Sequence, residues 1–216
     1  MTDTEVHEQT ALAARVLAHH GLVTAFGHVS ARLGGKIVVT PPTAPGLVRT
    51  ADLVTVDVDA DELPPGAAPE TWAHLAVYRA RPDVAAVARA QPESAFAAAA
   101  VTHELMPLHG QATWLGRRVP VHEPARLLRD PERAAAAART LADADALLLR
   151  GNGALTVGDS PGTAVARMWL LDAACRVHLA VAGHQARALD PDDIEAWREA
   201  APPLLERLWR HLADSS

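Results

Sequence analysis

Glu70 and His74 stand four residues apart in a segment of helical pattern, so their side chains fall on one face of the predicted helix. A carboxylate and an imidazole placed in this way can move a proton at a substrate or provide two ligands for a metal ion. Two ligands alone make a weak metal site, and no tight spacing links the pair to His103, His109 or His122. An acidic residue in the first turn of a helix also has a structural explanation, because the helix dipole favours it. The spacing therefore identifies two candidates for chemistry without assigning it.

Lys36 and Cys175 are the only lysine and the only cysteine in the chain. A Schiff-base enzyme needs a desolvated lysine with a lowered pKa, whereas Lys36 follows two glycines in a predicted hairpin turn, where water reaches it. Schiff-base chemistry is therefore not expected. A single cysteine cannot form an internal disulfide, and the apolar helical segment around Cys175 predicts an inert buried thiol.

Composition sets the class of protein. The chain has 216 residues, 49% of them apolar, and a formal net charge of −6 without a basic stripe, which argues against nucleic acid as a partner. Apolar runs such as Ala95–Val101 are too short to span a bilayer, so no membrane association is expected. The acidic segment Met1–Glu8 lacks the pattern of a signal peptide, and a cytoplasmic location is the default for a chain of this kind.

The elements that must position these side chains follow from hydrophobic periodicity and from proline and glycine. Helices are predicted at residues 5–20, 69–80, 92–100, 130–142, 160–182 and 190–212. Strands are predicted at residues 29–33, 36–40, 53–58, 84–88, 119–121, 147–149 and 154–157. Two glycines at 34–35 and the Gly-Asn-Gly segment at 151–153 predict hairpin turns. Strands mixed with helices around a mostly antiparallel meander predict one layered α/β or α+β domain spanning residues 1–216.

Six phrases, in this order, resemble the class II aldolase and adducin family, and in particular proteins similar to fuculose-phosphate aldolases. They are GHVSAR at 27–32 for G-N-x-S-x-R, VVTP at 38–41 for I-T-P, DLVTVD at 52–57 for D-L-V-x-V-D, Glu70 with His74 and Tyr78 for E-x3-H-x3-Y, RPDVAAV at 81–87 for RPDVxAV, and LRGNGA at 149–154 for L-x-x-H-G. Each phrase is weak by itself, but their shared order and spacing are specific. The resemblance covers about residues 8–185.

The resemblance implies the class II aldolase fold, a three-layer α/β/α domain with a central, mostly antiparallel sheet. It also implies a homo-oligomer, most commonly a cyclic tetramer with active sites between subunits, and a small-molecule substrate. Activities in the family include sugar-phosphate aldolases, a pentose-phosphate epimerase, a thiosugar dehydratase and decarboxylases. Their shared feature is a divalent metal, bound by the H-x-H and H-G histidines, that stabilises an enediolate. A glutamate supplies acid/base chemistry or completes the coordination.

This sequence departs from the family at all three metal-binding histidines. The H-x-H-P phrase aligns with residues 89–92, where Arg89 and Gln91 replace the histidines, and Asn152 replaces the distal histidine. An arginine side chain is permanently protonated, has no lone pair for a metal, and would repel a divalent ion. We therefore expect no metal in the usual place and no cofactor.

The positions that bind phosphate in the family are altered as well. His28 stands where the family has asparagine, and residues 40–43 (TPPT) lack the glycine of the family loop. Ala68 and Pro69 replace the serines before the glutamate. Phosphates are held by backbone N–H groups, hydroxyls and cations, and proline removes a donor. We expect an unphosphorylated substrate.

The first hypothesis is a metal-independent enzyme that acts through an enol or enolate on a small carbonyl or carboxylate substrate, with specialised biosynthesis as its suggested setting. The reaction classes left open are those of a lyase, including retro-aldol cleavage and decarboxylation, a dehydratase, and an isomerase or epimerase. Glu70 or His28 would move the proton. Arg89 would stabilise negative charge or bind a carboxylate, unless it forms a structural salt bridge with Glu70. The expected substrate-binding residues are Gln91, Asn152 and His74, although a structural role suits His74 equally.

Two alternatives remain. The first is a non-catalytic binding or scaffold protein, as in the adducin branch of the family; an open polar pocket at Glu70 would favour an enzyme, whereas apolar filling would favour a scaffold. The second is a relocated metal, held by Glu70, His74 and His28 or by a histidine of another subunit.

Overall fold

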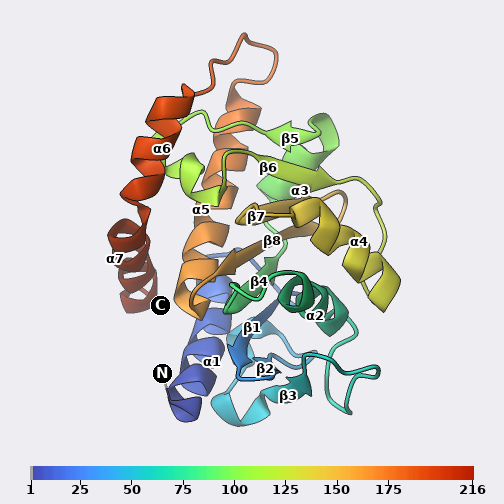
Figure 1. The fold of residues 1–216 in the computed structure, drawn as a ribbon. Helices are drawn as coiled ribbons and strands as arrows, with labels where there is room; N and C mark the ends of the chain where they lie inside the picture. Colours follow the sequence, from blue (N-terminus) through green and yellow to red (C-terminus); the bar gives the residue numbers. More distant parts are fainter. Residues whose placement is uncertain (1) are drawn as a thin grey trace.

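The structure, a computed structural model, describes residues 2–216 and contains an eight-stranded sheet with the order β3-β2-β1-β4-β8-β7-β6-β5 (Figure 1). Neighbouring strands are antiparallel except β6 and β7, which are parallel. The strands are β1 His28–Leu33, β2 Lys36–Val39, β3 Val54–Asp57, β4 Ala86–Ala90, β5 Glu104–Leu105, β6 Val119–His122, β7 Ala146–Leu149 and β8 Gly153–Gly158. The predicted mostly antiparallel sheet is confirmed.

Helices cover both faces of the sheet, and each face has its own core (Figure 1). One core joins α1 (Asp3–His19), α3 (Glu93–Val101), α5 (Pro161–Ala180) and α7 (Ala201–Asp214) to sheet residues such as Ala86, Ala88 and Ala90. The other joins α2 (Thr71–Ala80) and α4 (Pro131–Leu141) to residues such as Val87 and Leu155. Alternate residues of one strand thus face opposite cores, as the pleat requires. The three-layer α/β/α prediction is confirmed.

Capping residues fix where several helices begin. Asp130 and Ser160 each accept a hydrogen bond from the backbone N–H three residues later, and each is followed by a proline at the first helical position. Thr2 and Glu5 form a reciprocal capping box at the start of α1. Gly34, with φ of +61°, makes the tight turn that pairs Leu33 with Lys36.

Three boundaries differ from the sequence predictions. The strand predicted at 84–88 lies at Ala86–Ala90, because residues 81–84 form a turn closed by a hydrogen bond from the Val84 N–H to the Arg81 carbonyl. The helix predicted at 190–212 is two helices, α6 (Pro191–Glu199) and α7, since two prolines at 202–203 supply no N–H for a continuous helix. The helix predicted from residue 69 begins at Thr71, after a tight turn of i to i+3 bonds that includes Glu70.

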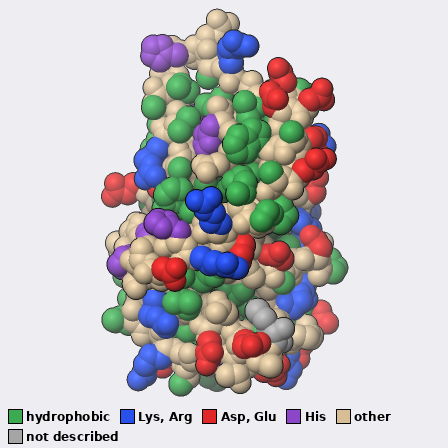
Figure 2. All heavy atoms as spheres, turned by 90° about the vertical axis from the view of Figure 1, so that its left-hand side faces the viewer, with side chains coloured by type: hydrophobic (Ala, Val, Ile, Leu, Met, Phe, Trp, Pro, Cys, Tyr) green, Lys and Arg blue, Asp and Glu red, His purple; other side chains and the backbone are tan. Residues whose placement is uncertain are grey.

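The C-terminal helices are fitted onto the domain by close contacts with two glycines. A side chain at Gly110 would collide with the Trp197 ring of α6, and one at Gly162 would collide with the Trp209 ring of α7. On the face that carries these helices, acidic, basic and apolar side chains are interspersed and neither charge sign forms a continuous patch (Figure 2). Among the described residues, we find no helix with both the length and the apolar character needed to cross a membrane.

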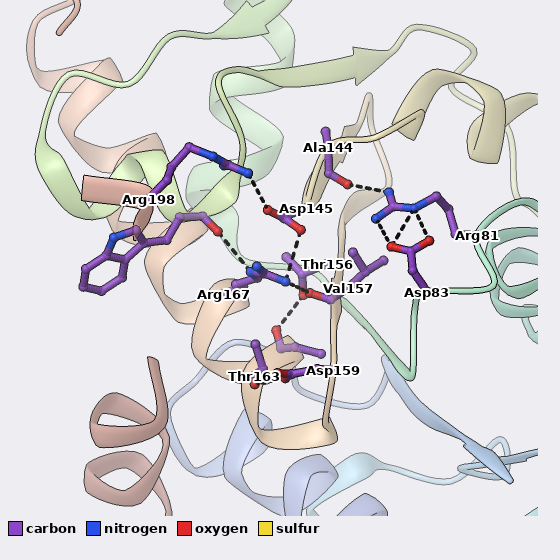
Figure 3. A network of polar contacts seen from close by, with 12 residues as sticks. Arg81, Asp83, Ala144, Asp145, Thr156, Val157, Asp159, Thr163, Arg167 and Arg198 are labelled. Atoms are coloured by element: carbon purple, nitrogen blue, oxygen red, sulfur yellow. Dashed lines mark hydrogen bonds and ion pairs between the residues drawn. The ribbon is translucent and has the colours of Figure 1, made fainter. Parts of the chain in front are cut away.

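A network of paired charges occupies the end of the sheet where β7 begins and β8 ends (Figure 3). Asp145 lies 3.2 Å from the Arg167 guanidinium and 3.6 Å from that of Arg198. Arg167 also donates to the Val157 and Trp114 carbonyls, at 2.7 and 3.0 Å. These contacts join the sheet to α5 and α6 beside a cavity of about 280 Å³. The residues predicted to act on a substrate do not line this cavity.

Candidate active site

The predicted site residues gather at the opposite end of the sheet, where β1 and β8 begin and β4 ends. His28 and Arg89 are directly opposite each other in the β1–β4 pair, and Arg89 is opposite Leu155 in the β4–β8 pair. Because Arg89 is two residues from Val87, its side chain emerges on the face covered by α2 and α4. Asn152 lies in the turn directly before β8. Strand register thus brings together three residues that are far apart in the sequence.

Arg89 is a buried cation without a contacting anion. Its residue surface is 2% exposed, and one terminal nitrogen donates to the Asn152 side-chain oxygen at 2.5 Å and to the Asn152 backbone oxygen at 3.5 Å. Within residues 2–216, no carboxylate forms a salt bridge with it, and its Nε has no partner. Burial lowers the pKa of the guanidinium, an effect that the more distant Glu70 opposes. The predicted alternative of a Glu70–Arg89 salt bridge is wrong.

Glu70 pairs instead with Arg129, a residue that no sequence pattern singled out. The Arg129 Nε donates to Glu70 Oε1 at 2.7 Å, and the Glu70 side chain is 11% exposed. Arg129 is held in place by the buried Leu128 before it and by the helix cap Asp130 after it. Burial by itself raises the pKa of Glu70, but the bond from Arg129 and the two guanidinium charges outweigh it, so the pKa lies below its usual value. Glu70 is therefore a carboxylate at neutral pH.

His28 is buried at the start of β1, with its Nδ1 3.3 Å from the Thr40 hydroxyl. The same hydroxyl oxygen accepts a hydrogen bond from the Val29 N–H at 3.2 Å. Burial, and then the charge of Arg89, lower the pKa of His28 to about 4. His28 is therefore neutral at physiological pH, and it can accept a proton but has no extra proton to give.

His74 is fixed by a buried chain of hydrogen bonds. The Tyr78 hydroxyl lies 2.9 Å from the Ser30 hydroxyl, which lies 2.7 Å from His74 Nδ1. The three groups thus form one continuous hydrogen-bond chain, with Ser30 between Tyr78 and His74. Burial lowers the pKa of His74 well below its usual value, so the ring is neutral at physiological pH.

Glu70 lies in the turn before α2 and His74 lies within α2, and the two side chains bond to different partners, Arg129 and Ser30. The two histidine rings of His28 and His74 are perpendicular, with centroids 6.3 Å apart.

Gln91 is half-buried directly after β4, and its backbone packs against Gly153. Gly153 has φ of +86°, and a Cβ there would lie 2.2 Å from the Ala90 carbonyl oxygen. Only glycine therefore fits beside Asn152 in this turn.

The residues at the family's metal positions do not fit a divalent metal. Arg89 places a cation there, and Asn152 uses its side-chain oxygen, the atom that could bind a metal, to accept from Arg89. Within residues 2–216, no three histidine, cysteine or acidic side chains are grouped closely enough to hold a metal ion. A relocated metal at Glu70, His74 and His28 therefore lacks a ligand set within one chain, and Glu70 is engaged by Arg129.

Unsatisfied polar atoms are concentrated at this end of the sheet. Six buried side-chain atoms of the described residues lack a hydrogen-bond partner, and four of the six belong to the site: Thr71 Oγ1, His74 Nε2, Arg89 Nε and Asn152 Nδ2. Each such atom costs stability unless water or a ligand pairs with it, so a group of four indicates a place where polar molecules can bind. The site is polar, but its residues line none of the five cavities found in the described part of the chain, so the open pocket at Glu70 that would favour an enzyme stays a prediction.

The structure thus brings together five predicted residues, namely His28, Glu70, His74, Arg89 and Asn152, and places Gln91 beside them. Three further residues of the site, Arg129, Ser30 and Thr40, were not predicted. Ser30 lies within the GHVSAR phrase and could have been found from it. Arg129 is 59 positions from Glu70, and its one local signal is that it precedes a helix cap.

Comparisons with known proteins identify the family and agree with the fold. The family model described as "Class II Aldolase and Adducin N-terminal domain" matches residues 8–179. The chain is 30% identical to a 3,4-dihydroxyphthalate decarboxylase of Arthrobacter keyseri over 98% of this chain and 94% of the relative, and 30% identical to one of Terrabacter sp. (strain DBF63) over 92% of each. Among solved structures, L-fuculose-1-phosphate aldolase of Thermus thermophilus is similar with a TM-score of 0.75 and 27% identity, over 83% of this chain and 95% of that one.

Proposed function

We propose that this chain, which belongs to the class II aldolase and adducin family, is a decarboxylase that acts on a small unphosphorylated carboxylic acid without a divalent metal in the family's metal position. Similarity to curated decarboxylases over nearly the whole chain supports the reaction class. The residues at the former metal position support the metal-free part of the proposal.

The observation that carries the proposal is the uncompensated guanidinium of Arg89. A buried charge is costly unless an opposite charge contacts it. Arg89 has only the amide and carbonyl oxygens of Asn152 as partners, and its Nε is free. A carboxylate substrate would supply the missing anion through charge-assisted hydrogen bonds, the geometry for which arginine is suited. A residue kept at such a cost is better explained by binding than by folding.

The reaction would use Arg89 where related enzymes use a metal ion. On a hydroxylated benzoate, a proton would first add to the ring carbon that bears the carboxylate, as the ionised hydroxyl oxygen becomes a carbonyl. The bond to the carboxylate then breaks, CO₂ leaves, and the electron pair restores the ring as a phenolate, an enolate-like anion. Arg89, with the Asn152 amide and, in its Nε2–H tautomer, the His74 ring as further donors, stabilises the negative charge on the phenolate oxygen. Glu70 would supply the proton that adds to the ring carbon, and His28 remains a neutral neighbour.

An unphosphorylated substrate is also supported by the contacts around β1. The Thr40 hydroxyl, which opens the loop where the family binds phosphate, is already engaged by His28 and the Val29 N–H. The next two residues, Pro41 and Pro42, offer no backbone donor. Few donors therefore remain for a phosphate group in this loop.

The test is CO₂ release by untagged protein after dialysis against a chelator, with 3,4-dihydroxyphthalate as the first substrate and other hydroxylated benzoates as alternatives. We expect turnover that added divalent metal does not increase. Arg89→Met should lower the rate about 10²-fold, corresponding to about 3 kcal/mol of lost charge stabilisation.

Arg150→Met is the matched control, because it removes an exposed arginine from the same β7–β8 hairpin that carries Asn152. We expect it to keep the wild-type rate. Activity that disappears with the chelator and returns with a metal would contradict the metal-free part of the proposal. Full activity of Arg89→Met would contradict the role of Arg89.

A further inference from the structure

The free protein has no acid ready for the protonation step of the proposed reaction. Glu70 is ionised because Arg129 bonds to it, and His28 is neutral because it is buried beside Arg89. Decarboxylation nevertheless consumes a proton at the carbon that loses CO₂. A change at the site on substrate binding must therefore free Glu70 and give it a proton.

Arg129 is the group in a position to make that change. Its side chain is 52% exposed, and Nε is its one nitrogen that bonds within residues 2–216, to Glu70. Its two terminal nitrogens face no acceptor among the described residues and remain free for an incoming anion. Since Leu128 and Asp130 anchor the backbone on both sides, the guanidinium can change its partner without movement of the chain.

We propose that Arg129 binds a second carboxylate of the substrate, and that this contact releases Glu70 as the proton donor. The substrate class is therefore a compact dicarboxylic acid, with one carboxylate at Arg89 and the other at Arg129. This inference rests on the proposed decarboxylase function and adds a second binding residue to it.

The arrangement of charged side chains at the site supports a substrate with two negative charges. From the interior outward, the site presents Arg89, Glu70 and Arg129, two cations around one carboxylate. The neighbouring histidines, His28 on β1 and His74 on α2, are uncharged at neutral pH. A dicarboxylate neutralises both guanidiniums and leaves Glu70 beside added negative charge without its partner. Glu70 then takes up a proton from solvent, since like charges nearby favour the neutral acid.

Atoms and charges balance over the cycle. Glu70 gains one proton as the dicarboxylate binds and gives it to the carbon that bears the leaving carboxylate, and the carbon–carboxylate bond then breaks with loss of CO₂. The product has one carboxylate fewer than the substrate, so it binds less tightly to the guanidinium groups of Arg89 and Arg129. The Glu70 carboxylate then returns to Arg129 as the product leaves.

Binding of two inert analogues tests the inference. Phthalate carries two carboxylates and benzoate one, and neither has the hydroxyl groups of the relatives' substrate. By titration calorimetry we expect phthalate to bind the wild type about tenfold more tightly than benzoate, the lower range for a half-exposed charge contact. Arg129→Ala should reduce phthalate affinity to that of benzoate and leave benzoate unchanged. Arg126→Ala, which removes an exposed arginine from the same loop, should change neither.

Proton uptake gives a second measurement. Titrations in buffers of different ionisation enthalpy should show about one proton taken up with phthalate by the wild type and by Arg126→Ala, and none by Glu70→Gln. Equal phthalate affinity in the wild type and Arg129→Ala, or binding without proton uptake, would overturn the inference. The proposed function fails in a distinguishable way, because Arg89→Met would then bind both analogues as well as the wild type does.

Discussion

Replacement of Arg89 by methionine is expected to make the protein more stable and less active. The substitution keeps much of the volume of the side chain but removes its buried charge. Two consequences oppose each other: the loss of the bond to Asn152, and relief from holding a cation in the interior with no contacting anion. Which of them is larger decides whether Arg89 is retained for folding or for a ligand.

The magnitudes favour stabilisation. Loss of the charge-assisted bond leaves the Asn152 oxygen without a donor and costs about 1–3 kcal/mol. Burial of an ion costs several kcal/mol when its attraction to an opposite charge does not repay it, and the nearest carboxylate, Glu70, is already engaged by Arg129. We expect a net gain of about 2 kcal/mol, or about 4–8 °C in Tm for a chain of this size. Arg89→Met combined with Asn152→Leu should gain more, because the orphaned amide is also removed.

Urea unfolding of the wild type and both variants measures the effect. Arg32→Met is the matched control on the adjacent strand: the Arg32 guanidinium donates to three carbonyl oxygens and lies 4.9 Å from the Tyr78 ring centroid. Its loss should destabilise the protein by about 1–3 kcal/mol. An Arg89→Met protein less stable than the wild type would refute the reasoning, because Arg89 would then be a net structural contributor.

Three further outcomes are expected. The pKa of His28 is about 4 in the folded protein and 6.5 in the unfolded chain, so its contribution to stability is complete above pH 6.5 and is lost as pH falls towards 4. Urea unfolding at a series of pH values should therefore show a fall in the free energy of unfolding over this range, and His28→Asn should remove about 3 kcal/mol of that fall. Ser30→Ala should lower the free energy of unfolding by about 2–4 kcal/mol, because His74 and a buried tyrosine hydroxyl each lose a partner, and an unchanged value would contradict the hydrogen-bond chain. Gly153→Ala should cost about 3 kcal/mol or more by thermal unfolding, whereas Gly34→Ala, at a similar positive φ but in open space, should cost about 1 kcal/mol.

Local chemistry explains which parts of the fold could be predicted. Gly34 and the caps at Asp130 and Ser160 act within a few residues, so their consequences were visible in the sequence. The same reasoning should have divided the last helix, because two adjacent prolines at 202–203 lack the N–H groups that a continuous helix needs. The resemblance to a family supplied the order of the layers, which periodicity alone does not fix.

The residues that gather at this end of the sheet were named from the sequence, but not all of their contacts could be predicted. The lost metal ligands identified Arg89 and Asn152 as linked positions, and the structure joins them by a hydrogen bond. The predicted partner of Glu70 was wrong, because the competing arginine comes from a loop 59 residues away that no spacing rule connects to it. The tetramer and the cytoplasmic location remain predictions.

The two ends of the sheet differ in how well their charges are matched. At one end, Asp145 contacts two arginines, and the Arg167 side chain also reaches two carbonyls, so each charge there has an opposite or a dipole beside it (Figure 3). At the other end, Arg89 remains unmatched. In energy-landscape terms, the charges at the first end are minimally frustrated and those at the second end are locally frustrated. Natural sequences tolerate such unfavourable interactions mainly at functional sites. Under selection for stability alone, Arg89 would be expected to be replaced before the paired charges at the first end. The persistence of an arginine at this position in close relatives would mark them as enzymes of the same kind.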